Sequence, residues 1–282
     1  MNEFFKKLGL PESMTAHQGS IDRMRQNYRP MNYDIRNQGE TSVIDIDGYI
    51  GRDLFMEWMT GEKSQNTVES LKEKLRDIKS SRILVNINSP GGSFNDGIVI
   101  MDLLQSKKAE VVTNLYGLSA SAATVIWQGG NTRRISKNAF PLIHRVMNGL
   151  MGNFNATSLL SMAEELEVLD NRLIQIYTER GAADIAKIEE LMDSGEGYGK
   201  FISADTAVEL GLADEVFDPA DKDDPDSDHL NSYTENYALL DSIMLQEAIK
   251  NMQQSAEKNQ EKPEETAFNK AYKQIIKNKG KL

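Results

Sequence analysis

The sequence predicts an α/β fold in which most strands of the sheet run parallel. Short apolar runs typical of buried strands alternate along the chain with segments whose apolar residues recur at helical spacing. Strands that alternate with helices in this way pair mostly in parallel. The chain has 282 residues, of which 39% are hydrophobic and 27% charged, enough for one sizeable core and a smaller appendage.

The predicted elements begin after a polar N-terminal arm. Residues 1–38 carry Pro11, Pro30 and scattered charges, and we expect no core contribution from them. Strands and helices then alternate, because apolar residues first alternate along residues 42–46 and then share one face of residues 67–79. Strands are predicted at 42–46, 82–88 and 110–116, and helices at 67–79, 94–105 and 121–127.

A long helix is predicted over residues 155–180, where Gly181 ends it. Its apolar residues recur at alternating spacings of three and four, at Leu159, Met162, Leu166, Leu169, Leu173 and Ile176. At about 1.5 Å per residue the helix spans about 39 Å, long enough to project beyond a compact domain. Burial in the core and contact with a second subunit both explain this stripe.

The composition changes at residue 218, which ends a predicted main domain of residues 39–217. Asp and Pro crowd residues 218–236, a pattern typical of an exposed acidic linker. Several of these acids fit the spacing of a calcium loop, but His229 stands where that loop needs glycine, which favours the linker. Residues 237–282 carry amphipathic patterns, so we expect a helical extension that serves as a scaffold or docks on a partner.

The composition also argues against several classes of function. Cysteine is absent and the three histidines are far apart in the chain, so we expect neither a metal site nor a cofactor. A net charge of −11 argues against nucleic acid, whose binding relies on clustered Lys and Arg. No uncharged apolar stretch reaches the roughly 18 residues of a membrane span, and no signal peptide is evident. We therefore expect a cytoplasmic protein that does not bind membranes.

Three segments favour catalysis by a serine nucleophile. A serine hydroxyl is a poor nucleophile by itself and needs both a base and donors for the developing oxyanion. Residues 117–123 (GLSASAA) stand where a strand turns into a helix, and His144 is the one histidine between the arm and the linker. Residues 88–92 (NSPGG) join another strand to a helix, and their two glycines let backbone amides approach a bound carbonyl.

Two serines compete for the role of nucleophile. Ser121 stands at the predicted start of a helix, where partial positive charge favours an anion. Ser119 has an alternative role as a capping or turn hydroxyl, and the segment lacks the second glycine of the usual nucleophile turn. We therefore prefer Ser121.

Taken together, these motifs resemble the proteolytic subunit of the Clp protease family, including the related head-maturation proteases of tailed phages. The resemblance runs from about residue 43 to residue 216 and includes residues 141–144 (PLIH) and 201–214 (FISADTAVELGLAD). It implies a crotonase-like superhelix of repeated β-β-α units with a protruding long helix. It also implies that Ser121 is the nucleophile and His144 the base, with the amides of Gly92 and Ala122 forming the oxyanion hole.

The acid of the catalytic triad is where this chain departs from the family pattern. The position at which the resemblance places the acid is Gly199, which cannot orient an imidazole. Asp193 and Glu196 lie in the glycine-rich segment 193–199, and we expect one of them to replace the acid. Asp193 is favoured because its shorter side chain has less conformational freedom.

The leading hypothesis is a serine endopeptidase of the phage head-maturation branch, acting on protein or peptide substrates in the host cytoplasm as a ring-type homo-oligomer. Capsid or scaffold proteins, or an ATP-dependent unfoldase, are the expected further partners. The chain has no P-loop pattern, so any use of ATP lies in a partner. One alternative is a protease-fold scaffold protein with impaired catalysis. The other is a crotonase-like acyl-CoA enzyme, for which the chain lacks a basic cluster.

Overall fold

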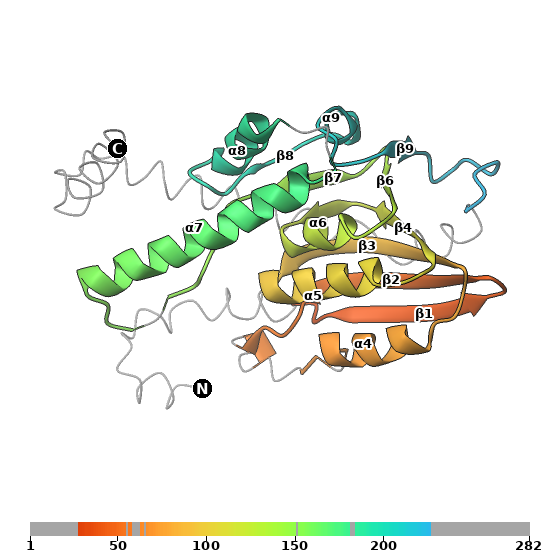
Figure 1. The fold of residues 1–282 in the computed structure, drawn as a ribbon, viewed down its shortest axis with the longest axis horizontal. Helices are drawn as coiled ribbons and strands as arrows, with labels where there is room; N and C mark the ends of the chain where they lie inside the picture. The colour runs from red at the N-terminus through yellow and green to blue at the C-terminus, as the bar shows by residue number, and fades with distance from the viewer. Residues whose placement is uncertain are drawn as a thin grey trace. The chain divides into compact units, whose positions relative to one another are not determined.

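The computed structural model describes residues 28–226, apart from 55, 58–62, 65, 151 and 181–183. These residues form two β-sheets with helices packed against them (Figure 1). The larger sheet has the order β1-β2-β3-β4-β6-β9 and consists of β1 (Asn32–Gln38), β2 (Thr41–Ile50), β3 (Arg82–Gly92), β4 (Glu110–Leu115), β6 (Thr132–Ser136) and β9 (Glu215–Phe217). The smaller sheet has the order β5-β7-β8 and consists of β5 (Leu118–Ala120), β7 (Phe140–Ile143) and β8 (Lys200–Phe201).

The helices of the described residues are α4 (Val68–Asp77), α5 (Phe94–Gln105), α6 (Ala122–Trp127), α7 (Ala156–Thr178), α8 (Ile185–Asp193) and α9 (Ala204–Glu209). The helices predicted between residues 67 and 127 are all present. Ser93 caps α5, because its side chain accepts a hydrogen bond from the Asp96 amide at 3.3 Å. None of the helices in the described part of the chain is both long and apolar enough to cross a bilayer.

The strands and helices repeat as β-β-α units. β4, β5 and α6 form one unit, and β6, β7 and α7 form the next. In each unit the first strand joins the larger sheet and the second joins the smaller sheet. Within the larger sheet, β1 and β2 are antiparallel and the other neighbouring strands are parallel. The mostly parallel α/β architecture expected from the sequence is therefore confirmed.

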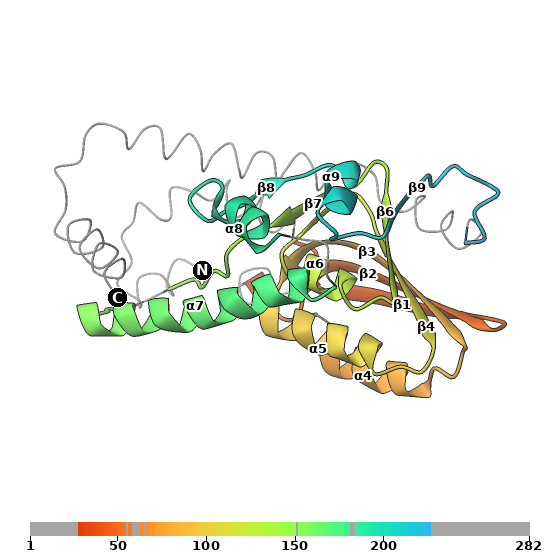
Figure 2. The same cartoon turned by 45° about the horizontal axis from the view of Figure 1, so that its top comes forward.

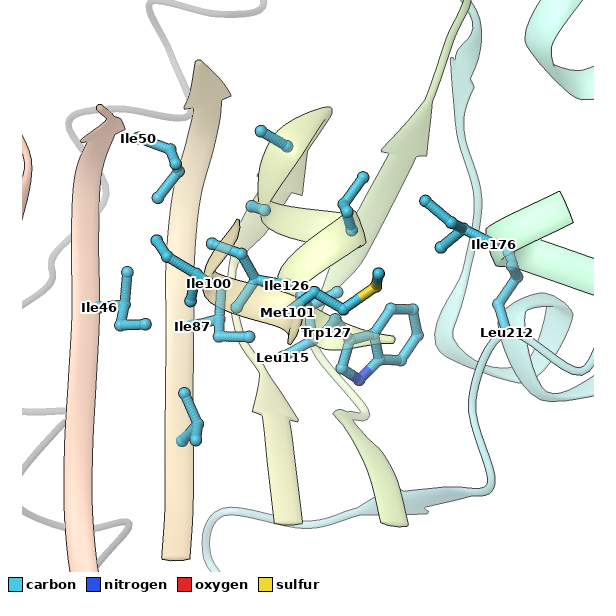
Figure 3. Close-up of a cluster of buried hydrophobic side chains, with 14 of the residues drawn as sticks. Ile46, Ile50, Ile87, Ile100, Met101, Leu115, Ile126, Trp127, Ile176 and Leu212 are labelled. Atoms are coloured by element: carbon cyan, nitrogen blue, oxygen red, sulfur yellow. The ribbon is translucent and has the colours of Figure 1, made fainter. Parts of the chain in front are cut away.

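The main apolar core lies between the larger sheet and the helices that cover one of its faces. Figure 3 shows Ile46, Ile87 and Leu115, from three neighbouring strands, beside Ile100 of α5 and Trp127 of α6. All five side chains are almost completely buried. Burial of a side chain of this size stabilises the fold by about 1.5–3 kcal/mol. The cluster therefore anchors α6, the helix that begins directly after Ser121, to the sheet.

The N-terminal arm predicted for residues 1–38 does not extend as far as residue 38. Residues 32–38 form β1, the edge strand that pairs with β2, and the side chains of Met31 and Tyr33 are buried in the core. Most of the other side chains in β1 are exposed or only partly buried, so the strand lacks a clear apolar pattern. The strand therefore depends on its pairing with β2. Residues 1–27 lie outside the described residues.

The prediction of an exposed linker is wrong for Asp224 and Asp226. Asp226 Oδ2 lies 3.0 Å from Arg82 Nη2 and 3.1 Å from Arg134 Nη1, and its side chain is only 4% exposed. Asp224 also forms an ion pair with Arg134. Arg134 is a buried cation on β6, and a buried charge requires opposite charges close by. Through these ion pairs the start of the acidic segment packs against the sheet. Residues 227–282 lie outside the described residues.

Helix α7 confirms the predicted long helix, and burial in the core explains the C-terminal part of its apolar stripe. Leu173, Ile174, Ile176 and Tyr177, near its C-terminal end, are buried in the core. Leu160 and Val168 are instead exposed, with 68% of Val168 accessible to solvent. Figures 1 and 2 show that the first part of α7 extends away from both sheets.

We predict that Asp226→Asn lowers the free energy of unfolding by about 2–3 kcal/mol, because it leaves two arginines short of a buried counter-charge. Asp223→Asn, at an exposed position in the same segment, should change it by less than about 0.5 kcal/mol. Chemical denaturation of the two variants and the wild type measures the difference. Equal stability of all three proteins would contradict a structural role for the Asp226 carboxylate.

Candidate active site

The smaller sheet brings Ser121 and His144 to the same edge. β5 and β7 pair in parallel, with Ala120 opposite Leu142. Ser121 directly follows β5 and His144 directly follows β7. The Ser121 amide donates a hydrogen bond to the Leu142 carbonyl at 3.0 Å, which joins the two strand ends. Two residues that are distant in sequence thus meet at the carboxyl ends of adjacent parallel strands.

Ser121 lies in a strained turn between β5 and α6. Its φ is 57° and its ψ is −128°, a conformation that non-glycine residues rarely adopt. A sharp, strained turn from strand to helix is how a nucleophile elbow exposes a serine hydroxyl. The hydroxyl makes no capping hydrogen bond to α6, so the turn does not use it for helix capping. The side chain is therefore held in place while its oxygen stays available for chemistry.

Ser119 has a structural role instead. It is completely buried, and its hydroxyl donates a hydrogen bond to the Tyr116 carbonyl at 2.8 Å. The Ser89 amide in turn lies 3.4 Å from the Ser119 oxygen. These contacts tie the start of the serine segment to the NSPGG segment, and they support the preference for Ser121 over Ser119.

The NSPGG segment, residues 88–92, passes directly beside Ser121. A Cβ atom added to Gly91 would lie 2.5 Å from the Ser121 Cβ and 3.0 Å from the Ala122 amide nitrogen, so only glycine fits there. Ser89 holds the segment in place, because its hydroxyl donates to the Gly48 carbonyl at 2.6 Å and accepts from the Gly91 amide at 3.0 Å. The Gly91 amide is thus engaged, and Gly92, whose amide the resemblance assigns to the oxyanion hole, pairs with Ile50 of β2.

His144 is partly buried, and one of its ring nitrogens is oriented by the backbone. Its Nδ1 lies 2.5 Å from the Arg145 carbonyl oxygen. Burial lowers the pKa of the imidazole, while this hydrogen bond and the charge of Asp170 act in the opposite direction. A lowered pKa keeps the ring neutral, and therefore able to act as a base, at pH values below its usual 6.5.

Gly199 also lies beside His144, at the position where the resemblance places the triad acid. β8 pairs antiparallel with β7, with Lys200 opposite Ile143. A Cβ atom on Gly199 would lie 2.0 Å from the Ile143 carbonyl oxygen and 3.0 Å from the His144 Cβ. Its φ of +71° also favours glycine. In this conformation residue 199 cannot carry a carboxylate.

The two acids expected as substitutes, Asp193 and Glu196, are both exposed. The Asp193 carboxylate accepts a hydrogen bond from Arg145 Nε at 2.7 Å, and its side chain is 61% exposed. Glu196 is exposed in the turn after α8 and has a φ of 60°. The acid that sequence reasoning missed near His144 is Asp170, in α7. The family resemblance directed attention to the segment around Gly199 instead. The signal that could have found Asp170 is its place within the apolar stripe of α7, between Leu166 and Leu173.

Other sites in the described residues offer less chemistry. No cluster of His, Cys, Asp and Glu within the described ranges has the arrangement needed to hold a metal ion. A cavity of about 450 Å³ is lined by the turn after β1, including Gly39 and Glu40, and by Asp77 at the end of α4 with the segment that follows it. It lies at the amino ends of β2 and β3, and none of the predicted catalytic residues lines it.

The site and the fold together have the features of a ClpP-like protein. These are a strained serine turn, a neighbouring histidine strand and a glycine-containing loop, all carried by repeated β-β-α units. The family model of Clp protease matches residues 38–220. The chain belongs to this family.

Several relatives carry the same family name. The ATP-dependent Clp protease proteolytic subunit 1 of Salinibacter ruber is 34% identical over 154 residues, which is 54% of this chain and 64% of the relative. The corresponding subunit of Chlorella vulgaris is 33% identical over 48% of this chain and 65% of its own length. The chain thus spans slightly less than two thirds of these two relatives.

The subunit of Streptococcus salivarius is matched more completely. It is 30% identical over 186 residues, which is 64% of this chain and 92% of the relative. Among solved structures, a mutant of ClpP1 from Listeria monocytogenes is similar, with a TM-score of 0.47 and 21% identity over 55% of this chain and 85% of its own.

We predict that Gly199→Asp, which places an acid at the family position, lowers stability instead of raising activity. The positive φ costs a non-glycine residue about 1–3 kcal/mol, and the contact with the Ile143 carbonyl adds to this. Gly199→Ala should cost a similar amount, which separates the backbone effect from the carboxylate. Thermal unfolding measures both variants, and a Gly199→Asp protein as stable as the wild type would contradict the prediction.

Proposed function

We propose that this chain is a serine endopeptidase that cleaves peptide bonds through an acyl-enzyme. The observation that carries the proposal is the strained Ser121 turn at the end of β5, joined to the end of β7 next to His144. Membership of the Clp protease family supports the same reaction. The names of the relatives describe those proteins as proteolytic subunits.

In the proposed reaction, the Ser121 oxygen attacks the carbonyl carbon of the scissile bond while its proton passes to His144 Nε2. The electron pair of the carbonyl moves onto its oxygen, which the amides of Gly92 and Ala122 stabilise. The tetrahedral intermediate then collapses, the C–N bond breaks, and the leaving amine takes the proton from His144. Water repeats the sequence on the acyl-enzyme and regenerates the Ser121 hydroxyl.

We predict that Ser121→Ala abolishes labelling by a fluorophosphonate probe and abolishes peptidase activity, while the protein stays folded. His144→Ala should retain only the slow reaction that the oxyanion donors support. Labelling detected by intact mass, with circular dichroism to monitor folding, measures both effects.

Ser119→Ala is the matched control for Ser121→Ala. It should still react with the probe but lose about 1–2 kcal/mol of stability, because the buried Tyr116 carbonyl loses its donor. Labelling that persists in Ser121→Ala and is lost in Ser119→Ala would reverse the assignment. A wild-type protein that never reacts would favour the alternative of a protease-fold scaffold protein, to which the glycine at position 199 also points.

We also propose that the protein assembles into a ring-type homo-oligomer through α7. The first part of this helix extends from the fold and exposes Leu160 and Val168, and isolated apolar side chains on such a helix gain stability from a partner surface.

We predict that the double variant Leu160→Asp with Val168→Asp lowers the oligomeric state without unfolding the protein. Both side chains are exposed in the monomer, so a charge there disturbs an interface but not the core. Ser161→Asp, an exposed polar position of the same helix, is the control. Light scattering measures the mass in solution, and a monomeric wild-type protein at micromolar concentration would refute the proposed assembly.

The substrate and partners proposed are those of the head-maturation branch of the family. Residues 237–282 lie beyond the part of the chain that matches the family model, and we propose that they dock on capsid or scaffold proteins. The relatives' names include ATP dependence, and in this chain that role would fall to a separate unfoldase. Incubation of the protein with the capsid protein encoded in the same phage genome tests whether it is a head-maturation protease. Cleavage that depends on Ser121 supports it, and an intact capsid protein beside a cleaved model peptide contradicts it.

A further inference from the structure

The hydrogen bond at His144 Nδ1 determines which ring nitrogen carries the proton. Nδ1 faces the Arg145 carbonyl oxygen at 2.5 Å. A carbonyl oxygen only accepts hydrogen bonds, so Nδ1 must be the donor. In the neutral ring, Nε2 is then the free acceptor, the nitrogen that a general base in a serine peptidase uses.

The peptide group that contains the Arg145 carbonyl also binds a carboxylate, through the amide at its other end. The Val146 amide donates a hydrogen bond to Asp170 Oδ1 at 2.7 Å. The Arg145 carbonyl and the Val146 amide belong to one planar peptide unit. A hydrogen bond at one end of such a unit polarises the other end, and a charged acceptor does so more strongly. The imidazole and the carboxylate are thus connected through a single peptide group.

Asp170 is largely buried, and its carboxylate has two partners, the Val146 amide and the Arg145 guanidinium. It lies in α7 with a side chain only 14% exposed, and its Oδ2 lies 3.8 Å from Arg145 Nη1. Burial raises the pKa of the carboxyl above its ordinary value, and the Val146 amide and the Arg145 guanidinium counteract this only in part, while the charge of Asp193 adds to the rise. Asp193 in α8 is bound to the same guanidinium from its solvent side, and Glu189 of α8 acts on it at longer range. An exposed, paired carboxylate such as Asp193 influences the imidazole little.

We propose that Asp170 replaces the missing triad acid and acts on His144 through the peptide group of residues 145–146. Asp170 is a positioning residue in this arrangement, since it touches neither the substrate nor the imidazole. It holds the peptide so that the Arg145 carbonyl keeps the proton on Nδ1 and stabilises the imidazolium formed when Nε2 takes the Ser121 proton. No proton moves to Asp170. The inference rests on the proposed roles of Ser121 and His144.

Asp170→Asn separates the charge of this residue from its hydrogen bond, because the Asn side-chain oxygen can still accept from the Val146 amide. We expect this variant to lower the rate of probe labelling and peptide cleavage by about 10-fold to 100-fold, less than the roughly 10⁴-fold that loss of a direct triad acid causes. The acid limb of the pH–rate profile should also move to lower pH, because the loss of negative charge lowers the pKa of His144. Local damage would reduce the fraction of active protein without moving that limb.

Asp193→Asn is the matched control, since it removes the other carboxylate bound to Arg145. We expect it to change the rate less than threefold and to leave the acid limb in place. A larger effect of Asp193→Asn than of Asp170→Asn would overturn the proposal, and so would an unchanged limb and rate in Asp170→Asn. If Asp170→Asn does not fold, the pair Asp170→Glu and Asp170→Gln, equal in length and different in charge, gives the same comparison.

A readout independent of catalysis separates this inference from the proposed function. In the Ser121→Ala background, NMR titration of the His144 ring should give a lower pKa when Asp170 is replaced by Asn. An unchanged His144 pKa would refute the coupling even if the enzyme is active. A shifted pKa in a protein whose wild type never reacts with the probe would support the coupling and refute the peptidase function.

Discussion

The parallel pairing of β5 with β7 is the constraint on which the candidate active site depends. It places Ala120 opposite Leu142, so that the residues after each strand, Ser121 and His144, emerge at the same edge. A shift by one residue would turn every following side chain to the other face of the sheet. The larger sheet protects this register, because each strand of the pair follows directly from a strand of that sheet within a β-β-α unit.

The strain at Ser121 is tolerated because its surroundings are tightly packed. α6 follows the serine and is buried along its whole length, and Trp127 at its end donates a hydrogen bond to the Arg134 carbonyl at 3.0 Å. On the other side, Gly91 approaches the serine too closely for any side chain. A positive φ at a serine costs about 1–3 kcal/mol, which a buried helix of this kind readily offsets.

The region around His144 is organised differently from the family pattern, and Gly199 is the reason. The antiparallel pairing of β8 with β7 presses the backbone of residue 199 against the Ile143 carbonyl, so no side chain fits there. Arg145 and the acids of α7 and α8 occupy the adjacent space. The glycine at position 199 thus occurs together with a network in which Arg145 binds acids from α7 and α8. This network links the base to α7, the helix that we propose for assembly.

The sequence by itself determined the α/β class, the order of elements from residue 41 to residue 127 except for β5, and the long helix, because these depend on local periodicity and capping. It also singled out Ser121, His144 and the NSPGG segment as candidates, since their residue types and order carry the family resemblance. Only the tertiary structure decided that residues 32–38 form a strand, that Asp224 and Asp226 are buried against Arg134, and that the Asp170 carboxylate binds the Val146 amide, two residues after His144. The ion pairs of Asp224 and Asp226 and the place of Asp170 depend on partners far away in the chain, which leave no local pattern to interpret. β1 pairs with the next strand but lacks a clear apolar pattern of its own.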